Sequence, residues 1–227
     1  MTKHTTTTRV PASDTRRAVA PKARRVPEET RSRLILAAKK LFARAGLHGV
    51  SVGEIAAEAH VSAAMINHHF GGKEALYRAC VEGFSEARLR ALDRLLVAPR
   101  TVEEMETRLD VLVTEMLEMH LEDPDAVTIL LRDANAAEHW GAEVERSVYE
   151  FTIKLSTFFA LAQKHGLLRA EVDPITPAAT LYLSLSGLLQ VDAHRERVTG
   201  VSLRDPKQRR EVVTRLLDII LRGATRR

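Results

Sequence analysis

Apolar residues recur every three or four positions along most of this chain, and that period is typical of amphipathic helices. The stripe that follows Pro27 is a clear example, because its charged residues fall mostly on the opposite side. No segment alternates with the period of two that half-buried strands show, so the predicted fold class is all-α. Beyond the first helix, longer stripes predict helices at about 73–96, 102–122, 126–136, 139–165 and 177–191, and from 205 onward.

Two shorter helices, joined by a tight turn, are predicted between the first helix and residue 73. Ser51 precedes Glu54 by three residues, the spacing of a capping box, in which hydroxyl and carboxylate satisfy free backbone N–H groups. Ser62 is a second N-cap candidate, and the glycine pair at 71–72 predicts the end of the second helix. Two capped helices so close together are typical of a helix-turn-helix, whose second helix enters the major groove of DNA.

The second short helix has a packing side and an open side. At 100° per residue, Ile66 and Phe70 point one way and Ala64 and His68 point the other. Asn67 flanks the open side, and its amide has the paired donor and acceptor that match adenine. Lys73 opens the next helix, where free N–H groups also favour a phosphate. The predicted DNA-contacting residues are Ser51, Ser62, Ala63, Ala64, Met65, Asn67, His68 and Lys73.

The run VSAAMINHHFGGKEAL at 61–76 resembles the DNA-binding signature of the TetR (tetracycline-repressor) family of bacterial regulators. The resemblance extends back to LILAAKKLFARAG at 34–46 and SVGEIA at 51–56. Tyrosines are usual in that family where this chain has Asn67 and His68, so the resemblance implies DNA binding without fixing a base preference. It also implies a helix-turn-helix domain at 27–73 and a helical effector-binding and dimerisation domain at 74–227.

Two C-terminal helices have more apolar surface than one neighbour can cover. The helix at 177–191 is apolar nearly all round, and the stripe of the last helix is broad. Together they predict a four-helix interface of a homodimer, as the resemblance implies; the alternative is the core of a monomer. Candidate effector-binding residues are Phe84, Asn135, His139, Trp140 and Gln190. The cluster around residues 132–140 has a plainer interpretation, in which its polar groups cap and solvate a helix junction.

The formal net charge of +4 is unevenly distributed. Residues 1–26 hold seven lysines and arginines against one acid, Asp14, and lack periodicity, so we predict a disordered basic arm. Such an arm is attracted to phosphate or simply aids solubility, and both interpretations stay open. We expect no signal peptide and no membrane span, since polar residues interrupt the apolar stretch at 174–191. Cys80 is the only cysteine, which suits a reducing cytoplasm and indicates a packed thiol rather than a redox sensor.

Most signatures of catalysis, metal binding and cofactor binding are missing from the sequence. The nine histidines show no HExxH spacing, and neither CxxC nor GxxxxGK[ST] occurs. The string GVSVG at 49–53 fits the pattern GxSxG, but its serine is Ser51, which the capping box already explains. His68 and His69 are adjacent on a helix and diverge by 100°, so they cannot readily share an ion. We therefore expect no enzyme activity, no cofactor and no metal.

These observations together predict a dimeric, cytoplasmic repressor that binds palindromic double-stranded operator DNA and is released by a small-molecule effector. The helix at 73–96 would carry the signal, because it begins beside the DNA-binding unit and continues into the C-terminal domain. The alternative is a DNA-binding regulator without a small-molecule inducer, controlled by a protein partner. No membrane contact is expected in either case.

Overall fold

The computed structural model describes residues 25–135 and 142–225, and these form ten helices. Pairing between extended residues is limited in this part of the chain to one isolated bridge between Leu168 and Thr225, so the all-α fold is confirmed. Helix α1 begins at Arg25, two residues before the proline expected to start it. The rest of the predicted basic arm lies outside the described residues. Within the described ranges, no helix is long and apolar enough to cross a membrane.

The N-terminal unit consists of α1 (Arg25–Ala45), α2 (Val52–Glu58) and α3 (Ala64–Phe70). Its apolar stripes converge on one core, in which Leu34, Ile55 and Ile66 are fully buried. Tyr77, from the next helix, packs into the same core, edge to face with Phe42 at 4.8 Å between ring centroids. The three helices are thus held by a core that also includes the start of α4.

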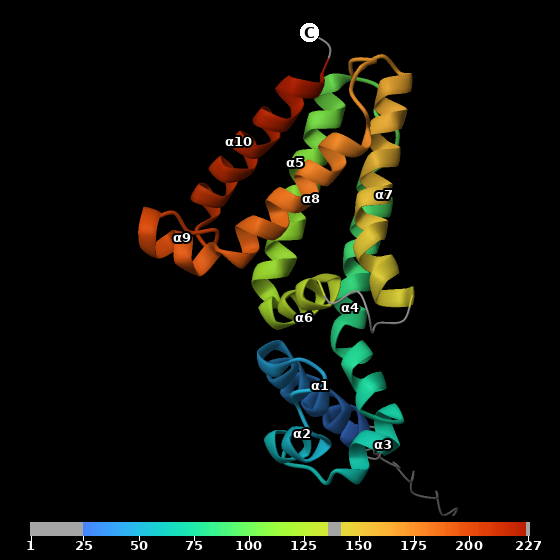
Figure 1. Cartoon of the computed structure of the whole chain (residues 1–227), viewed down its shortest axis with the longest axis vertical. Coiled ribbons are helices and arrows are strands. Elements are labelled where there is room, and N and C mark those ends of the chain that lie inside the picture. The colour runs from blue at the N-terminus through green and yellow to red at the C-terminus, as the bar shows by residue number, and fades with distance from the viewer. Residues whose placement is uncertain (1–24, 136–141, 226–227) are drawn as a thin grey trace, which may run out of the picture.

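Helix α4 (Lys73–Leu95) is the spine of the molecule and runs from the N-terminal unit into the C-terminal bundle (Figure 1). Helix α6 (Pro124–Asn135) lies across it, between the two halves (Figure 1). Buried side chains of α6, including Ala126 and Ile129, belong to the same core as α1–α3. The remaining helices are α5 (Val102–Glu122), α7 (Ala142–Lys164), α8 (Ile175–Gln190), α9 (Asp192–Thr199) and α10 (Pro206–Ala224).

Helix α9 is the one helix of the described chain that the hydrophobic pattern did not predict. Its sequence, DAHRERVT, has no apolar stripe, so periodicity gave no signal. It is held by its contacts instead: Asp192 pairs with Arg195 and accepts a backbone hydrogen bond from Leu203 at 3.4 Å. Asp192 and His194 lie in α9, beyond the end of the helix predicted at 177–191.

Candidate DNA interface and effector cavity

Local hydrogen bonds at both ends of the helix-turn-helix fix its shape. At the start of α2 the predicted capping box is present, with Glu54 N–H donating to Ser51 Oγ at 3.2 Å and Ser51 N–H donating to Glu54 Oε2 at 2.7 Å. The Ser51 N–H and hydroxyl donate to Glu54 and hold the pKa of that carboxyl below its usual value. At the end of α3, Gly71 adopts φ 80° and its N–H donates to Asn67 O at 2.9 Å, as the glycine pair predicted.

The predicted hydroxyl cap at Ser62 is wrong. Helix α3 begins at Ala64 with Ala63 as its N-cap, and no side-chain hydrogen bond caps this end. The Ser62 carbonyl, rather than its hydroxyl, joins the first turn by accepting from Met65 N–H at 3.0 Å. An exposed serine beside a free helix N-terminus leaves hydroxyl and backbone N–H groups open to other partners.

The outer face of α3 carries most of the residues expected to contact DNA. Ser62, Ala63, Ala64, Asn67 and His68 are all exposed, whereas Ile66 is fully buried. Met65 differs from expectation, because it is half-buried against the N-terminal core.

Ser51, expected to contact DNA, and Lys73, expected to bind phosphate, already make hydrogen bonds within the fold. Ser51 is exposed within its capping box. Lys73 Nζ donates to Val50 O at 3.0 Å, which ties the first turn of α4 to the chain just before α2. The ammonium has three donors, so this bond leaves capacity for a phosphate. This hydrogen bond therefore holds the start of α4 beside the start of α2, and both starts have free backbone N–H groups.

Two polar contacts connect α1 to α6 and to Asp123, the residue before α6, across the boundary between the halves. Arg132 Nη1 donates to Phe42 O at 3.1 Å, and its Nη2 donates to Ala43 O at 2.8 Å. It also reaches Arg44 O at 3.3 Å, so one guanidinium caps the C-terminal carbonyls of α1. Gly46, at φ 70°, permits this approach, since a Cβ there would lie 3.2 Å from Arg132 Nη1. Lys39 and Asp123 form the second contact, a salt bridge.

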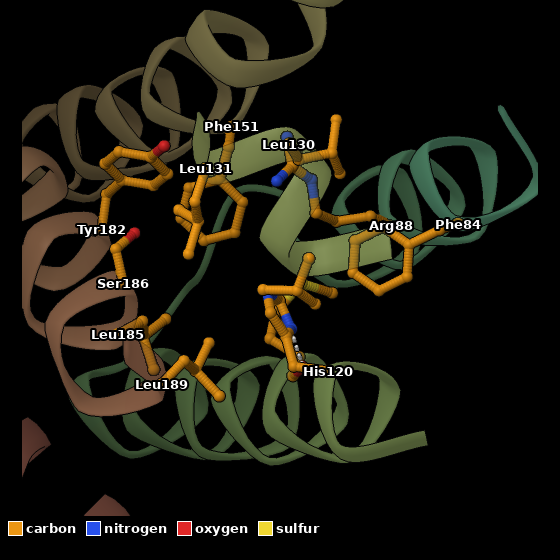
Figure 2. A pocket seen from close by; sticks show the side chains of 12 residues that line it. Phe84, Arg88, His120, Leu130, Leu131, Phe151, Tyr182, Leu185, Ser186 and Leu189 are labelled. Atoms are coloured by element: carbon orange, nitrogen blue, oxygen red, sulfur yellow. Dashed lines mark hydrogen bonds between the residues drawn. The ribbon is translucent and has the colours of Figure 1, made fainter. Parts of the chain in front are cut away.

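A cavity of about 30 Å³ lies where α4, α5, α6, α7 and α8 meet (Figure 2). Of the expected effector-binding residues, Phe84 lines this cavity and Gln190 lines an adjoining groove of about 570 Å³. Asn135 ends α6, but its side chain is not described, and His139 and Trp140 lie outside the described residues. The polar side chains lining the cavity were not predicted, and they are Arg88, His120, Tyr182 and Ser186.

A signal for two of these residues was present in the sequence. Arg88 follows Phe84 by one helical turn and so shares its buried side of α4. His120 follows Met116 by one turn in the same way on α5, and its Nδ1 contacts the Met116 carbonyl. A charged or titratable residue in register with an apolar stripe indicates a buried polar site, and this rule would have found both.

Burial shifts the pKa of three groups near α4. It lowers the pKa of Arg88, and Tyr182 and Glu150 partly offset that effect. It lowers the pKa of His120 to about 4, opposed by the hydrogen bond to Met116 O. It raises the pKa of Cys80 to about 12, which keeps the thiol protonated and supports its interpretation as a packed side chain.

His120 should make the fold less stable in mild acid. Its pKa falls from 6.5 to about 4 on folding, so the unfolded chain binds more protons between these values. The free energy of unfolding should therefore drop by about 1.4 kcal/mol per pH unit as the pH falls through that window. Urea unfolding across the window measures the slope, and His120→Leu should reduce it by this amount. Equal slopes for the variant and the wild type would refute the assignment.

Comparison with known proteins agrees with this arrangement. The family model "Bacterial regulatory proteins, tetR family" matches residues 34–80, which cover most of α1, the helix-turn-helix and the first turns of α4. The HTH-type transcriptional regulator BetI of Vibrio vulnificus is 47% identical over 51 residues, 22% of this chain and 26% of that protein. The HTH-type transcriptional repressor NicS of Pseudomonas putida is 27% identical over 212 residues, 88% of this chain and 94% of that protein.

A solved structure extends the agreement to the whole fold. A TetR family transcriptional regulator from Chloroflexus aurantiacus superposes with a TM-score of 0.70 at 22% identity, covering 89% of this chain and 96% of that one. Residues 34–80 carry the family signature, and the likeness of the C-terminal bundle to that structure is one of fold. The chain belongs to the TetR family of bacterial transcriptional regulators.

Proposed function

We propose that this regulator is a homodimeric repressor that binds palindromic operator DNA through α3 and is released by a small-molecule effector. The observation that carries the proposal is the course of α4. Its first turn is tied beside the helix-turn-helix through Lys73, and its middle lines the cavity through Phe84 and Arg88. One rigid helix thus touches both proposed sites. The proposed place of action is the cytoplasm, where bacterial operator DNA lies.

The exposed face of α3 supports the DNA-binding half of the proposal. Small and polar groups at Ala64, Asn67 and His68 suit close approach to base edges, and the buried Ile66 anchors the helix from behind. In a dimer the two copies of α3 would lie about one helical turn of DNA apart, roughly 34–36 Å, which matches a palindromic operator.

Exposed apolar residues on α8 and α10 support the dimer. These helices pack against each other, yet Leu183 on α8 remains 66% exposed and Ile219 on α10 remains 74% exposed. Their buried neighbours, such as Leu185 and Val213, already supply the core of the single chain. A second copy would bury the outer faces of both helices in a four-helix interface.

The position of α6 supports release by an effector. Its residues Val127, Leu130 and Leu131 line the cavity, while Arg132 and the Asp123 that precedes it hold α1. A cavity of about 30 Å³ holds little more than one water molecule, so a larger molecule must displace the surrounding helices. Because packed helices shift as units, displacement of α6 or α4 would move the helix-turn-helix.

Two linked measurements test the proposal. Selection of genomic fragments bound by the full chain would supply an operator, and a thermal-shift screen would supply compounds that bind. Each compound is then titrated against the operator complex, and DNA against the compound complex. Coupling must be reciprocal, so a true effector weakens operator binding and operator weakens effector binding by the same factor. Selection of no discrete DNA site would refute operator binding.

A second candidate function is a DNA-binding regulator controlled by a protein partner without a small-molecule inducer. The small volume of the closed cavity favours it, since typical ligand pockets enclose roughly 300–1,000 Å³. The screen separates the two, because this alternative predicts that compounds bound in the C-terminal bundle leave operator affinity unchanged.

Asn67→Ala should weaken operator binding selectively. Loss of the amide removes a paired donor and acceptor at the exposed face of α3, which should cost about 1–3 kcal/mol and relax base preference at one position per half-site. Fluorescence anisotropy on an operator and on each single-base variant measures both effects. Because Asn67 is exposed, urea unfolding should be unchanged. Equal affinity of variant and wild type for every DNA would rule out this contact.

A further inference from the structure

We infer that the basic arm is a second DNA-binding element, which contacts backbone phosphates on the flank of the half-site bound by α3. This inference rests on the proposed function, because it adds a contact to the same DNA. It goes beyond that function, which assigns no residue before Ser51 to DNA. Three observations carry it: the charge of the arm, the place where the arm joins the fold, and an arginine without an acidic partner next to that junction.

The positive charge of the chain is concentrated before α1. Residues 1–24 contain six lysines and arginines and one acid, so this segment carries a formal charge of +5. Because the whole chain carries +4, everything from Arg25 onward carries −1. The remainder is thus nearly neutral, and the attraction of the chain as a whole to a polyanion comes mainly from the arm.

The arm joins the fold beside the DNA-reading helix. Helix α1 begins at Arg25, and Figure 1 shows this end of α1 next to α3. The guanidinium carbon of Arg31 lies 5.3 Å from the ring centroid of Phe70, the last residue of α3. At 1.5 Å per residue, Arg25 is about 9 Å along the helix axis from that contact. An arm that serves solubility alone could join the fold anywhere, whereas an arm that binds operator DNA has to leave from this side.

Arg31 extends the positive charge from the arm to the end of α3. It is half-buried, and among the residues that the structure describes no acidic side chain pairs with it. The Phe70 ring holds the guanidinium through its face, so the five N–H donors stay available for phosphate oxygens. Glu28 and Glu29 are exposed in the first turns of α1, where the positive end of the helix dipole partly offsets their charge.

Length and composition of the arm suit the phosphate backbone. A chain of 24 residues spans at most about 80 Å, at roughly 3.3 Å per residue. One third of that length passes the phosphates of about eight base pairs, which rise about 3.4 Å each. Residues 1–24 include no asparagine or glutamine, the side chains that read adenine, whereas lysine, arginine and threonine all bind phosphate oxygens.

Three proteins and two duplexes test the inference. The proteins are the full chain, a form without residues 1–24, and a full-length form in which glutamine replaces the six cations of that segment. Those six are Lys3, Arg9, Arg16, Arg17, Lys22 and Arg24. Both duplexes hold the selected palindrome: the short one ends at its borders, and the long one continues on each side for about ten base pairs, one helical turn. Fluorescence anisotropy measures affinity across a series of salt concentrations.

Both altered arms should bind the long duplex less tightly than the full chain does, and the loss should grow as the salt concentration falls. Each phosphate contact contributes about 0.9 to the slope of log K against log salt. Loss of two or three contacts in each arm of a dimer should therefore lower that slope by about 4 to 5 units. On the short duplex the three proteins should differ little. Urea unfolding should be the same for all three, because α1 is unchanged from Arg25 onward.

Substitutions of Arg31 test the junction separately. Arg31→Met should lower the slope by about 2 units on either duplex, one contact in each subunit, and Arg31→Lys should keep it because the charge remains. Arg90→Met is the matched control, since Arg90 is exposed, pairs with Glu86 and lies about 26 Å along α4 from Lys73. A slope for Arg31→Met equal to that of Arg90→Met would count against a binding element at this end of α1.

The outcomes separate this inference from operator binding itself. Equal affinity of the three proteins for the long duplex at low salt would overturn the inference and leave α3 as the DNA-binding element. An arm effect that changes with the bases of the flank would also contradict it, because phosphates carry no sequence, whereas the minor groove does. Failure of the full chain to select any discrete DNA site would refute operator binding and this inference with it.

Discussion

Leu183→Glu is expected to convert the regulator into a monomer and to lower its affinity for a palindromic operator by about 100- to 10,000-fold, the gain that linking two binding units provides. Leu183 is 66% exposed in the middle of α8, on the outer side of the pair that α8 forms with α10. In a four-helix interface the two copies of this helix would bring the new carboxylates into a desolvated centre, and burial of unpaired charge opposes association.

Light scattering during size exclusion measures the mass, and anisotropy measures affinity for the full operator and for a half-site. Affinity for the half-site should stay the same, because α3 is unchanged. Val97→Glu is the matched control: Val97 is 52% exposed but lies in the loop between α4 and α5. A Leu183→Glu variant that remains dimeric would show that the interface lies elsewhere.

Arg132→Met is expected to uncouple the two halves. Wild type should lose operator affinity about 5- to 150-fold when an effector binds, the usual range of allosteric coupling. The variant should still bind the effector. However, its operator affinity without the effector, divided by its operator affinity with the effector, should fall most of the way to one. The reason is that this guanidinium holds the last carbonyls of α1, and α6 moves with the cavity wall.

Arg132→Lys should lie between wild type and Arg132→Met, because an ammonium cannot span the same carbonyls as a guanidinium. Exposed carbonyls also weaken the fold, so urea unfolding is measured alongside, with an expected loss of about 1–3 kcal/mol. Arg90→Met again serves as the surface control. If the effector lowers the operator affinity of Arg132→Met by the same factor as in wild type, the signal passes through α4 or through the Lys39–Asp123 salt bridge instead.

Features that depend only on residues close together in the sequence were predictable from it. The capping box at Ser51 and the glycine end of α3 each involve atoms within a few residues of one another, so spacing alone specifies them. Apolar periodicity located the long helices for the same reason. The family signature falls in this region, which is why DNA binding could be predicted before the fold was seen.

Two predictions for the helix-turn-helix were wrong because contacts with the rest of the unit determine the position of the residue concerned. Ser62 has the right residue type for an N-cap, but the turn before α3 places its carbonyl in the first turn instead. Met65 was assigned to the open face by helical geometry, yet the N-terminal core takes up its flexible side chain. Helix α9 lacks a stripe altogether and is held by tertiary contacts such as that between Asp192 and Leu203.

By itself, the sequence determined the all-α class, the helix-turn-helix and the outward face at Ala64, Asn67 and His68, because local hydrogen bonds and helical period set these features. Only the tertiary structure decided that Arg88 faces a cavity and that Arg132 caps α1. Phe151 lies 63 positions from Arg88 and Phe42 lies 90 positions from Arg132. Periodicity shows that a residue is buried on its helix, but the packing of distant helices determines what surrounds it there.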